Sequence, residues 1–183
     1  MATDYNGAKV RCIQMLVSPQ KDIVIFPYAK SEVPVVLADG TVVDSMYMAC
    51  YFPIELKYPY SAAELADKIE QGIDEWDKHK CYPDFSGKNT MEEKYYGVKG
   101  FRKAVKGCLC FKLGWDTTQG KYVSFRLPTK RGYAYLGIED TMLPDDADWL
   151  DFANAVIDFI NTDLSTLRRF KVFRSDLNVP WEW

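Results

Sequence analysis

The chain has 183 residues, of which 48% are hydrophobic and 27% charged, and its formal net charge is −3. These values are typical of a folded globular protein, so they exclude disorder over most of the length and predict one domain spanning residues 1–183. Five cysteines, an odd number, favour reduced and mostly buried thiols over a disulfide framework. The start lacks an apolar signal core, and no apolar run approaches the roughly 20 residues of a membrane span. We therefore expect a cytoplasmic protein with no membrane partner.

Short segments at the start of the chain predict strands. Val10–Val17, Asp22–Tyr28 and Met46–Phe52 are rich in apolar, β-branched or aromatic residues. Residues 33–43 predict a hairpin, because the Asp-Gly pair in their middle suits a two-residue turn. The first quarter of the chain is therefore expected to be β structure.

The next segment predicts an amphipathic helix from Ser61 to near His79. Ser61 and Glu64 have the spacing of a capping box, in which each side chain binds the backbone N–H of the other residue. Apolar residues then recur at helical spacing and define a buried stripe. The stripe consists of Leu65, Ile69, Ile73 and Trp76. Residues 81–90 contain proline and glycine and predict a loop.

The second half predicts a helix start at Thr90 with a short helical or irregular stretch to about Lys106, then a three-stranded meander and a second long helix. The meander strands span Cys108–Trp115, Lys121–Leu127 and Tyr133–Ile138, and the helix spans Asp146–Asn161. We therefore expect an α+β fold, with an antiparallel or mixed sheet of about six strands and two main helices packed on it. The aromatic tail, residues 175–183, is expected to fold back onto the body.

Charge reverses sharply in the second half. Residues 91–131 carry ten Lys/Arg and three Asp/Glu, whereas residues 132–163 carry eight Asp/Glu and no Lys/Arg. Two interpretations of the acidic residues stay open: they cap and solvate the second long helix, or they form a negative surface that docks a basic partner and speeds its capture. The candidate partner-binding residues are Glu139, Asp140, Asp145, Asp146, Asp148 and Asp151.

The basic segment 94–131 suggests a different function. Its lysines and arginines could neutralise phosphates, and the tyrosine and phenylalanine rings between them could stack on bases, so nucleic-acid binding is an alternative. A sequence pI of about 5.3 and the lack of a known module signature argue against it. A solvated basic face with its aromatics turned inward explains the pattern equally well. The candidate basic residues are Lys99, Arg102, Lys103, Lys106, Lys130 and Arg131.

Catalytic and metal-binding patterns are weak. His79 is the only histidine, and a catalytic dyad would have to join it to Cys81, but no local signature supports such a site. These two residues and Cys108 with Cys110 could supply four zinc ligands, although two cysteines on one strand face are more often core residues. We therefore expect no enzyme activity, no cofactor and no metal.

One phrase of the sequence resembles a known group of proteins. The phrase KYYGVKGFRK at residues 94–103 precedes paired strands, a basic turn, an acidic stretch with Leu143-Pro144 and a helix. This order, over residues 92–160, resembles immunity proteins of bacterial contact-dependent growth inhibition and related polymorphic toxin systems. The chain departs from that pattern at Gly100, where a serine is expected, and at Asp151-Phe152-Ala153, which replaces a Leu-Gly pair.

The resemblance implies a role. Such immunity proteins are small, cytoplasmic and non-enzymatic, and they bind the toxic C-terminal domain of a delivered effector, often a nuclease. They inhibit it by covering the active site or a neighbouring surface. An acidic patch suits a toxin with a nucleic-acid-binding cleft, because carboxylates can mimic phosphates. The resemblance thus favours the acidic candidates over the basic ones as the docking surface.

Overall fold

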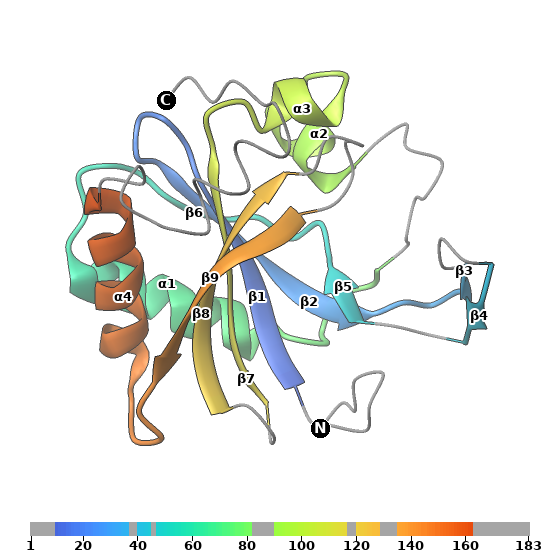
Figure 1. The fold of residues 1–183 in the computed structure, drawn as a ribbon. Helices are drawn as coiled ribbons and strands as arrows, with labels where there is room; N and C mark the ends of the chain where they lie inside the picture. Colours follow the sequence, from blue (N-terminus) through green and yellow to red (C-terminus); the bar gives the residue numbers. More distant parts are fainter. Residues whose placement is uncertain are drawn as a thin grey trace.

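The computed structural model describes residues 10–36, 40–44, 47–81, 90–116, 120–128 and 135–162. These residues form an α+β fold with a mainly antiparallel sheet, as the sequence predicts (Figure 1). The strands are β1 (Val10–Val17), β2 (Ile23–Lys30), β3 (Val35–Val36), β4 (Val42–Val43), β5 (Tyr47–Ala49), β6 (Ile54–Leu56), β7 (Leu109–Asp116), β8 (Gly120–Pro128) and β9 (Tyr135–Leu143). The helices are α1 (Ala62–Asp74), α2 (Met91–Tyr96), α3 (Phe101–Ala104) and α4 (Trp149–Asn161).

The main sheet joins the two halves of the chain. Its strand order is β5-β2-β1-β7-β8-β9, and β6 also pairs with β2. In the hairpin β1–β2 and in the meander β7–β8–β9, strands that are consecutive in the sequence pair with each other. The antiparallel pairing of β1 with β7 joins these two units into one sheet. Strands β3 and β4 form a separate two-stranded sheet that lies to one side of the body (Figure 1).

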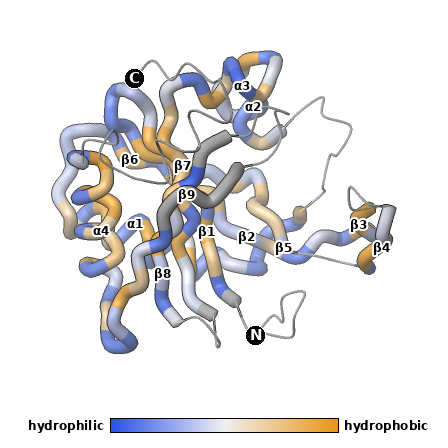
Figure 2. The backbone as a smooth tube through the Cα atoms, viewed as in Figure 1, coloured by the Kyte–Doolittle hydropathy of each residue, from blue (hydrophilic) through white to orange (hydrophobic). Residues whose placement is uncertain are grey.

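The two faces of the main sheet carry different helices. Side chains alternate along a strand, so Ile13 and Met15 of β1 point one way and Gln14 and Leu16 the other. Ile13 and Met15 are fully buried in the core that α1 and α4 cover, and these two helices lie side by side. Leu16 packs against α2 on the opposite face. Figure 2 shows that α4 alternates between apolar and polar positions, as expected for a helix with one buried side.

Helix α1 ends earlier than the sequence predicts. It stops at Asp74 and does not continue to His79. The reason is Asp77, which has a left-handed backbone (φ 60°), donates its N–H to the Tyr28 carbonyl at 2.9 Å and accepts the Lys30 N–H at 3.1 Å. These bonds tie the chain after α1 to the end of β2, so a contact distant in sequence overrides the local helical pattern.

Other boundaries also differ. The last meander strand runs over Tyr135–Leu143 and is therefore longer than predicted, and α4 begins at Trp149 because Asp148 and not Asp146 caps it. The short strand Ile54–Leu56 was not predicted, and it pairs with β2. Residues 82–89, where a loop was predicted, and the tail at 175–183 lie outside the described residues. Among the described helices, none has the length and apolar character needed to cross a membrane.

Candidate protein-binding surface

Two of the predicted acidic residues cap helix α4. The Asp148 carboxylate accepts the backbone N–H groups of Leu150 and Asp151 at 2.8 and 3.0 Å. Asp151 returns the contact by accepting the Asp148 N–H at 2.9 Å, which completes a capping box. Both side chains are exposed, and their negative charge also suits the positive end of the helix dipole. The capping interpretation is therefore confirmed for Asp148 and Asp151.

The turn between β9 and α4 presents two further carboxylates to solvent. Asp145 and Asp146 are exposed. Lys121 of β8 fixes this turn, because its ammonium donates to the backbone carbonyls of Asp145 and Ala147, both at 2.6 Å. The turn is thus held against the sheet through its backbone while its carboxylates face outward.

The other two acidic candidates, Glu139 and Asp140, precede the turn and belong to strand β9. Asp140 is paired with Ser124, and the two side chains share the sheet face on which α2 packs. Asp140 is exposed, but it lies on the opposite side of the sheet from α4. Glu139 belongs to the same strand, and its side chain lies outside the described part of the chain. The structure therefore brings four of the six candidates together and separates Asp140 from them.

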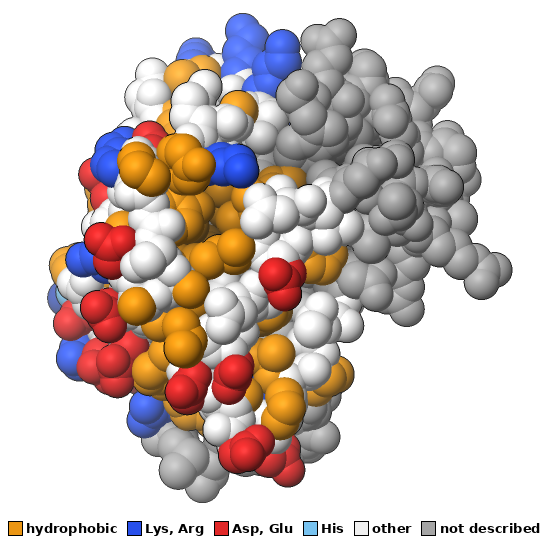
Figure 3. Space-filling model, turned by 90° about the vertical axis from the view of Figure 1, so that its left-hand side faces the viewer, with side chains coloured by type: hydrophobic (Ala, Val, Ile, Leu, Met, Phe, Trp, Pro, Cys, Tyr) orange, Lys and Arg blue, Asp and Glu red, His pale blue; other side chains and the backbone are white. Residues whose placement is uncertain are grey.

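Helix α1 adds carboxylates that sequence reasoning did not include. Its outer side is exposed and acidic, and α1 lies beside α4. Figure 3 shows most of the acidic side chains along the left and lower parts of this side, with some lysines or arginines among them and further basic side chains at its top. We call these exposed carboxylates of α1, α4 and the β9–α4 turn the acidic helical surface. It consists of Glu64, Asp67, Glu70, Asp74, Asp145, Asp146, Asp148, Asp151 and Asp158.

An apolar side chain lies within the acidic helical surface. Leu150 of α4 is 43% exposed, between the capping residues Asp148 and Asp151. The acidic helical surface therefore combines negative charge with one exposed apolar side chain.

The basic candidates form a different surface, around α3. Lys99, Arg102, Lys103 and Lys106 are exposed, whereas Lys130 and Arg131 lie outside the described residues. Phe101, in the middle of this segment, is only 3% exposed. The basic side chains thus point outward and this ring points inward.

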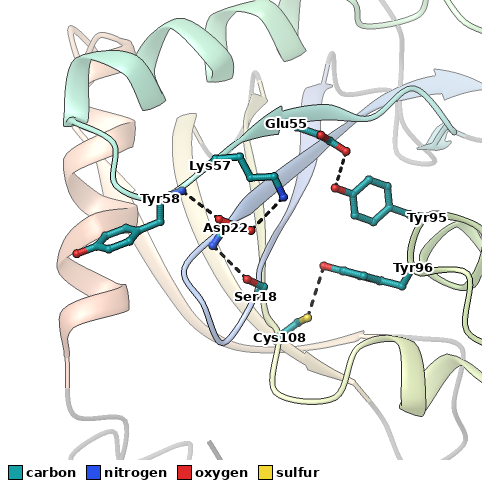
Figure 4. A network of polar contacts seen from close by, with 8 residues as sticks. All are labelled: Ser18, Asp22, Glu55, Lys57, Tyr58, Tyr95, Tyr96 and Cys108. Atoms are coloured by element: carbon teal, nitrogen blue, oxygen red, sulfur yellow. Dashed lines mark hydrogen bonds and ion pairs between the residues drawn. The ribbon is translucent and has the colours of Figure 1, made fainter.

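The tyrosines of α2 hold this segment to the sheet. The Tyr95 hydroxyl donates to Glu55 at 2.7 Å, and the Tyr96 hydroxyl accepts the Cys108 thiol at 3.6 Å (Figure 4). Burial is the main cause that raises the pKa of both hydroxyls above their ordinary value. Both hydroxyls are thus engaged within the protein, and the Tyr95 ring also packs edge-on against Phe26, with the ring centroids 5.7 Å apart.

His79 and Cys81 have separate partners. His79 bonds to Glu75 at 2.8 Å and stacks on Phe52, whereas the Cys81 thiol packs beside Cys50. Burial raises the pKa of the Cys81 thiol, which keeps it protonated and poorly nucleophilic.

The four proposed zinc ligands are also dispersed. Cys108 and Cys110 belong to two different packing clusters, and neither cluster contains Cys81. Within the described ranges, no group of three or more His, Cys, Asp or Glu side chains is arranged to hold a metal ion.

Comparisons with known proteins give a likeness of fold alone. No family model and no curated protein matches the chain. Among solved structures, a protein of unknown function from Neisseria meningitidis matches with a TM-score of 0.47 and 11% identity, over 84% of this chain and 94% of that one. A CdiA-CT/CdiI toxin and immunity complex from Yersinia pseudotuberculosis matches with a TM-score of 0.49 and 9% identity, over 81% of this chain and 94% of that one.

Proposed function

We propose that this chain is an immunity-type protein, which binds and neutralises a toxin domain through its acidic helical surface and catalyses no reaction itself. The observation that carries the proposal is the gathering of carboxylates from α1, α4 and the β9–α4 turn on one side of the molecule. The sequence resemblance over residues 92–160 agrees with this role.

Electrostatics support a protein partner of positive charge. A surface with one sign of charge attracts an oppositely charged partner over distance, and it raises the association rate above that of neutral surfaces. A toxin that cleaves nucleic acid needs a positive cleft to hold phosphates. Carboxylates on a folded surface can occupy such a cleft in place of phosphates, and this would block access to the substrate.

Rigidity supports the same proposal. The capping box of Asp148 with Asp151 and the bonds from Lys121 to the turn hold the backbone below the carboxylates. A surface already ordered before binding loses less conformational entropy on association. We expect the protein to act in the cytoplasm, where a toxin that attacks nucleic acid would meet its substrate.

The proposal is tested by capture followed by a growth assay. The tagged chain is used as bait in a source-cell lysate that has been treated with nuclease, and bound material is eluted at moderate salt. We expect one stoichiometric polypeptide, and its C-terminal domain, expressed alone, should arrest growth. Co-expression of this chain should restore growth.

Two results would refute the proposal. One is a captured domain that arrests growth equally with and without this chain. The other is recovery of nucleic acid before nuclease treatment and of no polypeptide after it, which would favour the basic residues around α3 instead.

A further inference from the structure

Two cationic side chains lie on the sheet face opposite α1 and α4. Lys112 of β7 pairs with Ser124 of β8, and Arg126 of β8 pairs with Cys110 of β7. Ser124 and Cys110 are buried on the face where α2 packs, so Lys112 and Arg126 point to that same face. They come from adjacent strands and from neighbouring rows of the sheet.

Both cations are half-buried, and within the described ranges neither has a carboxylate at ion-pair distance, although Asp140 lies on the same face, across from Ser124. In the same ranges, the buried Arg126 Nε donates no hydrogen bond. Burying a charged donor without a partner costs free energy, so such groups in native proteins usually have a protein partner, an ion or a ligand. The nearby Glu92 carboxylate accepts a hydrogen bond from Gln14 at 2.9 Å.

Lys112 and Arg126 lie close to the same region of this sheet face. The Lys112 ammonium lies 5.7 Å from the centre of the Tyr28 ring. Burial raises the pKa of the Cys12 thiol to about 11, and the positive charges of Lys112 and Arg126 oppose that rise. Cys12 thus lies within electrostatic reach of both cations, which places ammonium and guanidinium around one region of the β1–β7–β8 surface.

An irregularity in the sheet lies next to Arg126. The register between β8 and β9 shifts between Phe125 and Arg126, so that Arg126 pairs with Gly137. Bulges of this kind redirect side chains and are frequent beside binding sites. Because Gly137 is a glycine, no side chain stands directly opposite Arg126 at its paired position on β9.

We propose that Lys112 and Arg126 form a binding site for a phosphate-type oxyanion, with the Ser124 hydroxyl as a further hydrogen-bond donor. A guanidinium offers two parallel N–H groups that match the oxygens of a phosphate, and an ammonium adds a compact positive charge. This site lies on the other side of the sheet from the acidic helical surface, and it stands independently of the proposed function.

The site is tested on the full chain with inorganic phosphate and with adenosine monophosphate. Each is titrated by calorimetry at constant ionic strength, balanced with chloride. We expect saturable binding of one phosphate per chain. Affinity should fall about tenfold or more in Lys112→Gln and in Arg126→Gln, because each variant removes a charged hydrogen-bond donor. Arg126→Lys keeps the charge but not the paired N–H groups, so it should bind at an intermediate level.

Matched controls separate a built site from general charge attraction. Lys99→Gln and Lys103→Gln remove the same charge from the exposed surface around α3 and should leave phosphate affinity unchanged. Tighter binding of the nucleotide than of inorganic phosphate would identify the ligand as a phosphate ester. No saturable binding to the wild-type chain, or an equal loss of affinity in the control variants, would overturn the proposal.

Discussion

Asp148 caps helix α4 and also belongs to the acidic helical surface, so its structural and docking roles must be separated. Its carboxylate accepts two backbone N–H groups at 2.8 and 3.0 Å and holds the first turn of α4. Replacing an N-cap aspartate by alanine typically lowers the free energy of unfolding by about 1 kcal/mol. We expect this loss for Asp148→Ala, together with a fall in Tm of ~2–4 °C for a chain of this size.

The assay is equilibrium unfolding in urea, followed by circular dichroism. Asn caps helices about as well as Asp, so Asp148→Asn should keep nearly all of the stability although it loses the charge. Asp145→Ala and Asp146→Ala, which remove exposed carboxylates from the adjoining turn, should change the unfolding free energy by less than about 0.5 kcal/mol. The reasoning is wrong if Asp148→Ala is as stable as these two variants, or if Asp148→Asn is as unstable as Asp148→Ala.

Two further predictions concern stability. Folding lowers the pKa of Asp22, mainly because its carboxylate accepts the Tyr58 N–H and secondly because it binds Lys57. The ionised carboxylate therefore stabilises the fold at pH values above its unfolded pKa of about 3.9. This stabilisation is lost as the pH falls through the lower folded pKa. Asp22→Asn should therefore be less stable than wild type at pH 7, and urea titrations should show this difference in unfolding free energy closing as the pH falls below the unfolded pKa and through the lower folded pKa. A difference that stays constant with pH would contradict this. At Gly114 an added Cβ would lie 2.2 Å from the Arg11 carbonyl oxygen, whereas at Gly97 (φ +63°) it would meet nothing within 4 Å. Gly114→Ala should thus cost about 3 kcal/mol or more and Gly97→Ala about 1 kcal/mol, and equal losses in urea unfolding would refute the packing argument.

Local signals in the sequence predicted local structure. The predicted Ser61–Glu64 capping box forms, because the interacting groups lie within one turn of each other. The helix start predicted at Thr90 also forms, and the structure shows that a second capping box, Thr90 with Glu93, holds it. Short segments rich in apolar, β-branched or aromatic residues likewise located β1, β2 and the meander. Such predictions depend only on residues that are close to one another in the sequence.

Features that depend on distant contacts could not be predicted. The end of α1 is set by Asp77 binding to β2, and the pairing of β1 with β7 joins segments about half the chain apart. The acidic helical surface was only partly identified, because the carboxylates of α1 join it only once α1 and α4 pack together. The same holds for Lys112 and Arg126, since only the strand register shows that they share a face.

The most direct test of a docking role for the acidic helical surface is the association rate constant with the captured toxin domain. The variant Asp67→Lys/Asp145→Lys/Asp146→Lys reverses three exposed charges without touching a helix cap, and Lys99→Glu/Lys103→Glu is the control on the basic side. Stopped-flow measurements at low and high salt should show association slowed about tenfold or more in the acidic variant at low salt, with the difference shrinking as salt rises. An unchanged rate in that variant, or a loss confined to the control, would contradict the account.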